Sequence, residues 1–392
     1  MDLVFLTTSL DRGGAETQVV RIATTLRRRG WQVGILTMLP SSAFLEDIQA
    51  AGIPLAECLG AQDRIPWRSA WRIIRQLHRW RPGILATFNF PADAFGRVCG
   101  RIARVPTIVS AVGTTRIKTR LREQFYRRTE PLIAMTVANS KAAASALTAQ
   151  GILSARKTCV IPNGLILDQF PHPAGRAEVR AALGVEDHEF LWIAVGNLRP
   201  AKDYPTLLEA AARCAKARPG FRLTIVGGGA GADLKPAADA PYAEGLRQRA
   251  AALGLDPAVA FLGSRADVPW LLRAADAFVL SSAWEGMPNT VMEAMASGLP
   301  VVATDVGDVR ELVEEGRSGS MVPAQQPEAL AERMLAMMDL GRDALAAQGA
   351  WARQRIRDRY ENERVVDQWE ALFRQLAPPG DRFRLQGQPT GM

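Results

Sequence analysis

Residues that bind metals are scarce in this chain of 392 residues, and the few present are dispersed. Four cysteines and three histidines occur, and none has the short spacing of a zinc or haem site. We therefore expect reduced, mostly buried thiols. The chain also lacks an Asp-x-Asp motif, so the sequence does not indicate a metal-held diphosphate.

Long hydrophobic runs are absent as well. No segment reaches the roughly 18 apolar residues that would span a bilayer. Residues 1–6 carry no positive charge ahead of an apolar stretch and resemble a strand, so we expect no signal peptide and a cytoplasmic location. No Gly-x-Gly-x-x-Gly opens either half of the chain, which disfavours a dehydrogenase.

The net charge of +8 is unevenly distributed. Residues 1–165 contain 23 Lys/Arg and 10 Asp/Glu, a balance of +13, whereas the remainder contains 25 and 30, a balance of −5. A basic first half predicts an anionic partner. The chain has no zinc pattern, RNA-binding aromatic motif or basic tail, so an anionic membrane surface or a lipid diphosphate suits it better than nucleic acid.

Apolar strand-like segments alternate with helical segments throughout the chain. We predict strands near 3–8, 32–38, 83–88, 106–112, 132–138 and 157–161, then near 190–196, 221–226, 258–262, 277–281, 300–303 and 319–322. This alternation is typical of parallel sheets covered by helices on both faces. A segment rich in proline and glycine near 162–175 separates two such series. The fold class predicted is therefore α/β, with two doubly wound domains around a ligand-binding cleft.

Two glutamates seven residues apart make up the most informative motif. Glu285 follows a predicted strand, and Glu293 lies in the helix that we expect to begin near Pro288. The main-chain amides of Asn289, Thr290 and Val291 are candidate donors to a phosphate, because a helix N-terminus attracts anions. Taken alone, such a pair often only complements the helix dipole.

The full string from Glu285 to Asp305 resembles the signature of the retaining, two-domain GT-B glycosyltransferases called group 1 or family 4. This resemblance implies that Glu285 holds the hydroxyls of the transferred sugar and that Glu293 holds the ribose. Gly286, Met287 and Pro288 would line the donor site. It also implies metal-independent transfer from a nucleotide-diphosphate sugar.

The resemblance extends to other loops that follow strands. Gly13 and Gly14 match the N-terminal glycine loop, although a simple tight turn explains them equally well. Lys202 matches the family lysine that neutralises the diphosphate, and Arg199 is a candidate substitute for the family arginine, whose place Asn197 occupies.

Two further positions border the expected nucleotide site. Gly227 matches the second-domain glycine loop, and Arg265 is a candidate contact to the base, or else a solvated side chain.

One departure concerns a histidine that many family members place in the first domain. Residues 107–116 contain none, so either Arg116 takes over part of its role, or this subgroup works without it, or the chain is an inactive relative. The neighbouring basic residues Arg116, Lys118, Arg120 and Arg122 are candidates for acceptor or membrane contact. A second basic segment, 64–81, predicts a helix with an arginine stripe and an apolar face that contains Trp71 and Leu77.

These observations predict a glycosyltransferase that uses a UDP-sugar donor, with retention, and a saccharide or lipid-linked acceptor in cell-surface polysaccharide or glycolipid biosynthesis. The expected domains are an acceptor-side domain (1–165), a nucleotide-sugar domain (166–360), a helix crossing back to the first domain (361–377) and a disordered tail (378–392). Two alternatives remain. A sugar-nucleotide epimerase of the same fold would consume donor without an acceptor, and a non-catalytic binder would never turn over.

Overall fold

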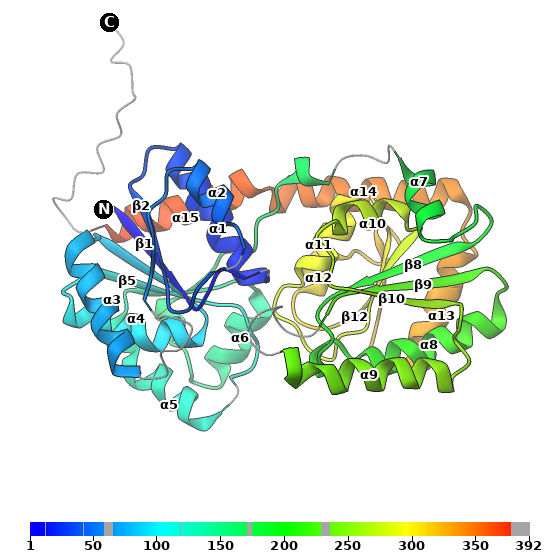
Figure 1. Cartoon of the computed structure of the whole chain (residues 1–392), viewed down its shortest axis with the longest axis horizontal. Helices are drawn as coiled ribbons and strands as arrows, with labels where there is room; N and C mark the ends of the chain where they lie inside the picture. Colours follow the sequence, from blue (N-terminus) through cyan, green and yellow to red (C-terminus); the bar gives the residue numbers. More distant parts are fainter. Residues whose placement is uncertain are drawn as a thin grey trace, which may run out of the picture. The chain divides into compact units, whose positions relative to one another are not determined.

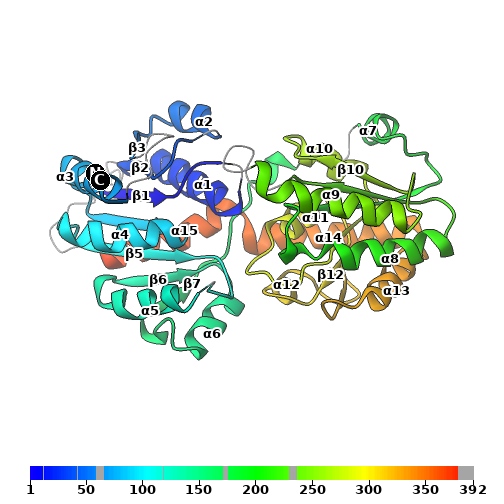
Figure 2. The same cartoon turned by 60° about the horizontal axis from the view of Figure 1, so that its bottom comes forward.

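A computed structural model describes residues 1–11, 13–41, 43–58, 66–117, 119–170, 175–228 and 236–377, without the side chains of residues 66–67 and 236–240. The expected tail at 378–392 and Lys118 lie outside these residues. The chain forms two compact units (Figures 1 and 2). Unit 1 is Met1–Gly164 together with the segment that begins at Asn362, and unit 2 is Leu165–Glu361.

Unit 1 is built on a seven-stranded sheet in the order β3-β2-β1-β4-β5-β6-β7, and all its pairings are parallel. Its strands are β1 (Leu3–Thr7), β2 (Val33–Thr37), β3 (Leu55–Glu57), β4 (Ile84–Phe88), β5 (Thr107–Val112), β6 (Met135–Ala138) and β7 (Thr158–Val160). Its helices are α1 (Gly14–Arg28), α2 (Leu45–Ala50), α3 (Pro66–Trp80), α4 (Phe90–Ile102), α5 (Arg120–Thr129), α6 (Lys141–Ala149) and α15 (Asn362–Leu376), with 3₁₀ turns η1 (Glu130–Leu132) and η2 (Ala155–Lys157).

Successive residues of β1 face opposite sides of the sheet, and each side has its own core. Leu3 and Phe5 pack with α1 and α15, whereas Val4 and Leu6 pack with α3 and α4. All four side chains are fully buried. Because a strand covered on both faces must be apolar throughout, β1 appears in the sequence as a continuous hydrophobic run.

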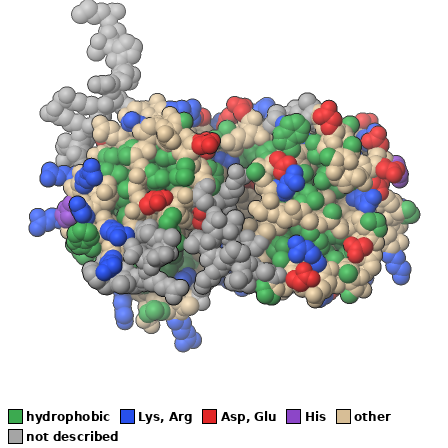
Figure 3. Space-filling model, in the orientation of Figure 1, with side chains coloured by type: hydrophobic (Ala, Val, Ile, Leu, Met, Phe, Trp, Pro, Cys, Tyr) green, Lys and Arg blue, Asp and Glu red, His purple; other side chains and the backbone are tan. Residues whose placement is uncertain are grey.

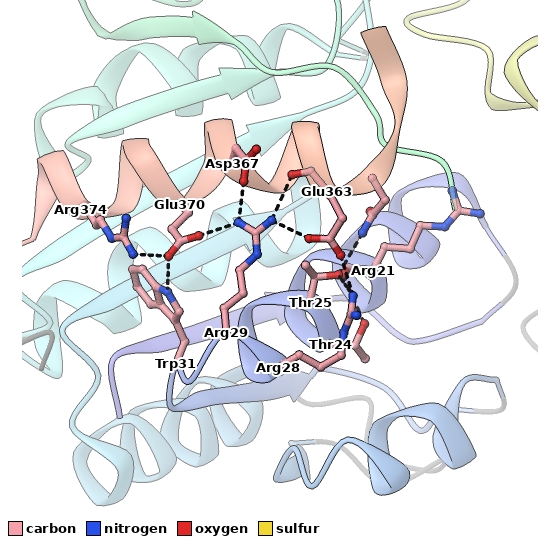
Figure 4. Close-up of polar contacts among 11 residues, drawn as sticks. Arg21, Thr24, Thr25, Arg28, Arg29, Trp31, Glu363, Asp367, Glu370 and Arg374 are labelled. Carbon is pink, nitrogen blue, oxygen red and sulfur yellow. Dashed lines mark hydrogen bonds and ion pairs between the residues drawn. The ribbon is translucent and has the colours of Figure 1, made fainter. Parts of the chain in front are cut away.

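The last helix, α15, completes the core of unit 1. Trp369 and Phe373 contact the aromatic rings of Phe88, Phe5 and Trp31. Figure 4 shows the polar contacts along one side of this helix, where Arg29 bonds Glu363, Asp367 and Glu370 at 2.6–2.7 Å. A segment from the end of the chain is therefore part of the first unit.

Unit 2 is built on a six-stranded parallel sheet in the order β10-β9-β8-β11-β12-β13. Its strands are β8 (Phe190–Val195), β9 (Phe221–Val226), β10 (Val259–Gly263), β11 (Ala277–Leu280), β12 (Val301–Thr304) and β13 (Gly319–Val322). Its helices are α7 (Arg176–Ala182), α8 (Tyr204–Ala217), α9 (Pro236–Ala252), α10 (Val268–Ala274), α11 (Asn289–Ala296), α12 (Val309–Leu312), α13 (Pro327–Met338) and α14 (Arg342–Tyr360), with 3₁₀ turns η3 (Leu167–Gln169) and η4 (Pro200–Lys202).

The α/β fold class predicted from the sequence is confirmed, and every predicted strand region contains a strand. The prediction missed β3, a three-residue edge strand too short to show a pattern. On α3, Leu77 of the predicted apolar face is buried together with Ile73, whereas Trp71 of that face has an exposed fraction of 56%. None of the described helices is long and apolar enough to cross a membrane.

Candidate functional site

The strand order of unit 2 reverses between β8 and β11. The chain continues from β8 to β9 on one side and from β11 to β12 on the other. The two loops that leave β8 and β11 therefore diverge, and ligands of doubly wound sheets bind in the crevice that such loops leave. Residues 196–203 and 281–288 form these loops, and they contain Arg199, Lys202, Glu285 and Gly286.

An ion pair joins the two loops. Lys202 Nζ donates to Glu285 Oε1 across 2.6 Å, with exposed side-chain fractions of 20% and 14%. Ser282 Oγ donates to the same carboxylate oxygen at 2.7 Å. The structure thus brings together two residues that lie 83 positions apart and that the sequence predicted separately.

Main-chain contacts fix the positions of both loops. Ser281 Oγ donates to the Lys202 carbonyl at 2.8 Å, and the Ala283 N–H donates to the Ala201 carbonyl at 2.9 Å. Thr304 Oγ1, at the end of β12, donates to the Ser282 carbonyl at 2.7 Å. Contacts between the loops after β8 and β11, together with one from the end of β12, therefore hold the backbone that carries the ion pair.

Tyr204 supports the loop that follows β8. Its buried hydroxyl donates to the Gly196 carbonyl at 2.8 Å. Burial raises the pKa of Tyr204, and the Glu285 carboxylate raises it further, so the phenol stays protonated and keeps the proton that it donates to Gly196. Sequence reasoning missed Tyr204, Ser281 and Ser282; polar side chains at the ends of buried strands were the available signal.

The helix α11 begins at Asn289, one residue after Pro288, which has an extended backbone. Val291 N–H donates to the Pro288 carbonyl at 3.2 Å, so this amide, a predicted phosphate donor, already has a helical partner. Thr290 Oγ1 is enclosed and has no hydrogen-bond partner among the described residues. Met287 is buried in the core of unit 2, and Glu293 is half-buried on α11.

The loop after β12 contacts the Glu285–Gly286 turn. Asp308 N–H donates to the Gly286 carbonyl at 2.9 Å. Gly307 has a φ of 57°, and a Cβ at this position would lie 2.3 Å from the Gly286 carbonyl oxygen. No sequence motif indicated a role for this loop, and in the structure it packs against the Glu285–Gly286 turn.

Gly227 and Arg265 each have partners within unit 2. A Cβ on Gly227 would lie 1.9 Å from the Gly196 carbonyl oxygen, so close packing of two loops alone requires glycine there. Arg265 makes a bidentate ion pair with Asp267, at 2.8 and 2.6 Å, on the surface.

The remaining predicted residues belong to unit 1. Gly13 precedes α1, and its carbonyl accepts hydrogen bonds from the N–H and Oγ1 of Thr17. Gly14 is the first residue of α1. Arg116 and Arg120 are exposed, whereas the guanidinium of Arg122 lies over the Phe90 ring, 4.3 Å from its centre. Among the described residues, no group of three or more His, Cys, Asp or Glu side chains is placed to hold a metal.

Comparison with known proteins identifies the family of the chain. Residues 189–339 match the family described as "Glycosyl transferases group 1", and residues 12–169 match "Glycosyltransferase Family 4". The D-inositol 3-phosphate glycosyltransferase of Geodermatophilus obscurus is 30% identical over 93% of this chain and 85% of its own. The lipopolysaccharide core biosynthesis mannosyltransferase LpsB of Rhizobium meliloti is 30% identical over 55% of this chain and 60% of its own length.

Solved structures agree. The Anabaena Alr3699/HepE structure in complex with UDP superposes with a TM-score of 0.82 at 25% identity, covering 96% of this chain and 100% of that one. Its complex with UDP-glucose gives a TM-score of 0.83 with the same identity and coverage. With matches along both units and a relative aligned over nearly the whole chain, the protein belongs to the group 1, family 4 glycosyltransferases of GT-B fold.

Proposed function

We propose that this glycosyltransferase transfers a hexose from a UDP-sugar to a saccharide or lipid-linked acceptor, with retention and without a metal, in the assembly of a cell-surface polysaccharide or glycolipid. The observation that carries the proposal is the ion pair between Lys202 and Glu285 at the switch point of unit 2. One structural relative, the Anabaena protein at 25% identity, was solved with UDP and with UDP-glucose, which supports UDP as the nucleotide.

The donor diphosphate would lie between Lys202 and the start of α11. The main-chain amides of Asn289 and Thr290, in the first turn of α11, would donate to an anion at that position. Val291 would contribute less, because its amide already donates to the Pro288 carbonyl. Arg199, exposed at the start of η4, would add a second positive charge. Glu293 would bind the ribose hydroxyls, and Gly227 and Arg265 would border the nucleotide.

Glu285 would accept hydrogen bonds from the transferred sugar. In the transfer, the bond between the anomeric carbon and the diphosphate oxygen breaks, and a bond to the acceptor oxygen forms on the same face. The acceptor proton goes to the departing phosphate. Lys202 lowers the barrier, because its fixed charge stabilises the negative charge that develops on the leaving group.

Unit 1 would supply the acceptor side. Gly13 and Gly14 open the first strand-to-helix loop, and Arg116 stands where a family histidine is absent. We propose that Arg116, with Arg120 and Arg122, attracts an anionic acceptor. The overall basic charge of unit 1 would also favour a location at the cytoplasmic face of a membrane.

The test is a donor screen by thermal shift with UDP-, GDP- and ADP-sugars in the presence of EDTA. A donor at 100 times its Kd should stabilise the fold by about 2.7 kcal/mol. We expect one UDP-sugar to raise the Tm of the wild type and not that of Glu293→Ala. Incubation with acceptor, followed by NMR of the product, then reports the anomeric configuration.

Four results would contradict the proposal. Stabilisation only by GDP- or ADP-sugars would reject UDP, and loss of binding in EDTA would reject metal independence. Consumption of the donor without any acceptor would favour the epimerase alternative. Donor binding without turnover across a panel of acceptors would favour a non-catalytic binder.

A further inference from the structure

One stretch of unit 1 is almost free of acidic residues. Residues 66–117 contain nine arginines and a single acidic residue, Asp93. Asp93 is fully buried beside the equally buried Arg97 and accepts hydrogen bonds from Thr87 and Tyr126. Asp93 is therefore hydrogen-bonded inside the fold, and it does not offset the positive charge of the arginines at the surface.

The exposed arginines gather on two neighbouring helices. The helices α3 and α4 pack together, and Cys99 Sγ contacts the Ala70 carbonyl between them at 3.8 Å. The exposed arginines of these helices and of the turns that follow them are Arg68, Arg72, Arg75, Arg79, Arg81, Arg101 and Arg104. Figure 3 shows Lys and Arg side chains (blue) along the edge of unit 1 where α3 lies. No acidic residue occurs in α3.

A pocket lies between the ends of these two helices, with a volume of about 630 Å³. His78, Arg81 and Arg104 supply basic groups, and Leu77, Ile102 and Val105 supply apolar ones. Arg81 and Arg104 come shortly before β4 and β5, so the pocket is at the amino-terminal edge of the sheet. The predicted glycine loop, which follows β1, is at the opposite, carboxyl-terminal edge.

The backbone at both pocket arginines is left-handed, with φ of 44° at Arg81 and 58° at Arg104. Each follows the end of a helix, where glycine is the favoured residue because it has no Cβ to strain. An arginine is strained in this conformation because of its Cβ, whereas a glycine is not. Two such positions on the same pocket indicate that the side chains serve a purpose that glycine would not.

Large apolar side chains are exposed beside the pocket. Trp71 and Ile102 have exposed fractions of 56% and 57%, and Val98 has 42%. The Arg75 guanidinium lies over the Trp71 ring, 5.3 Å from its centre. A small anion in solution would need only the basic groups. A lipid surface would contact both the basic and the apolar side chains, since aromatic and aliphatic side chains enter the membrane interface while arginines bind phosphates.

We propose that the α3–α4 face, comprising the seven arginines above with Trp71, Val98 and Ile102, docks on an anionic phospholipid surface, and that the pocket binds a headgroup phosphate. This assigns membrane contact to a surface at the other edge of the sheet from the acceptor arginines near Arg116. Vesicle binding needs neither donor nor acceptor, so its outcome is independent of the transfer reaction.

The experiment measures co-flotation of the full chain with vesicles of phosphatidylcholine alone or with about a third phosphatidylglycerol. The key variant is Arg81→Gly with Arg104→Gly, which removes two charges at positions whose backbone suits glycine, so its Tm should not fall. Each basic residue near an anionic leaflet contributes roughly a fivefold factor, so affinity for anionic vesicles should fall about 30-fold. The control, Arg342→Ala with Arg359→Ala, removes two exposed charges from unit 2 and should bind as the wild type does.

A second variant, Trp71→Ser with Ile102→Ser, separates a lipid from a free anion. We expect it to lose vesicle binding while inorganic phosphate still protects the pocket arginines from a guanidine-directed reagent. Equal vesicle binding by the wild type and the glycine variant would overturn the proposal. So would phosphate protection in a wild type that does not float with anionic vesicles, which would identify a site for free phosphate.

Discussion

Lys202 and Glu285 each hold the other in place at the end of unit 2's sheet. The ammonium has a carboxylate partner at 2.6 Å, and Ser282 donates to the same carboxylate oxygen. Both groups therefore keep a defined position before a ligand arrives. Preorganised charge of this kind stabilises a transition state more than a mobile side chain does, since no reorganisation accompanies the reaction.

Lys202→Met should lower kcat by about 100- to 1,000-fold, because it removes the charge opposite the leaving diphosphate. The matched control is Arg222→Met, which breaks the Arg222–Glu189 pair elsewhere in unit 2 at similar exposure (24% and 12%). Steady-state kinetics and thermal melts of both variants provide the comparison. We expect similar losses of Tm and a loss of kcat in Lys202→Met alone; an equal loss of kcat in both would assign Lys202 a structural role.

The loops after β8, β11 and β12 act as one element. Gly307 lies against the Glu285–Gly286 backbone, and Asp308 donates to the Gly286 carbonyl. The position of Glu285 therefore depends on a loop that itself carries no proposed ligand contact. The contact is made by main-chain atoms, which a side-chain motif does not reveal.

Gly307→Ala should weaken donor binding, because the new Cβ would meet the Gly286 carbonyl oxygen at 2.3 Å and displace the turn. Gly316→Ala is the control: its φ of 76° is also left-handed, but nothing lies within 4 Å of the added Cβ. Both substitutions should cost about 1 kcal/mol of stability through backbone strain. Titration of each variant with the donor would show a raised Kd for Gly307→Ala only, and equal Kd values would mean that the loop after β12 does not position Glu285.

At the scale of the molecule, α15 packs against α1 in unit 1, although the whole of unit 2 lies between them in the sequence. Helix α15 buries aromatic side chains in the core of unit 1 and makes a line of ion pairs with Arg29, at the end of α1 (Figure 4). Burial alone would raise the pKa of Glu370, but hydrogen bonds from Trp31 and Arg29 hold it below the ordinary value. The pKa of Glu363 is lowered in the same way by Arg29 and Arg28, against the effect of burial.

These lowered pKa values make the fold sensitive to acid. A carboxyl whose folded pKa lies below its unfolded value of about 4.3 stabilises the fold above that pH and loses the contribution as the pH falls further. Glu370→Gln should therefore lower the free energy of unfolding at pH 7 by roughly 2 kcal/mol, and with it the Tm. Below about pH 4.5, the Tm of this variant should fall less steeply than that of the wild type. Thermal melts from pH 7 to pH 3 check this, with the exposed Glu244→Gln as the control. A Glu370→Gln profile parallel to the wild type would contradict it.

The sequence by itself determined the α/β class and the family, because buried parallel strands must be continuously apolar and because the motif from Glu285 to Asp305 is contiguous. The donor-site assignments and the domain roles stay predictions. Only the tertiary structure decided that Lys202 meets Glu285, that Gly307 supports the turn and that Trp71 is exposed. The physical reason is that these contacts join residues far apart in the chain, many through main-chain atoms, and no local pattern encodes which distant surfaces come together.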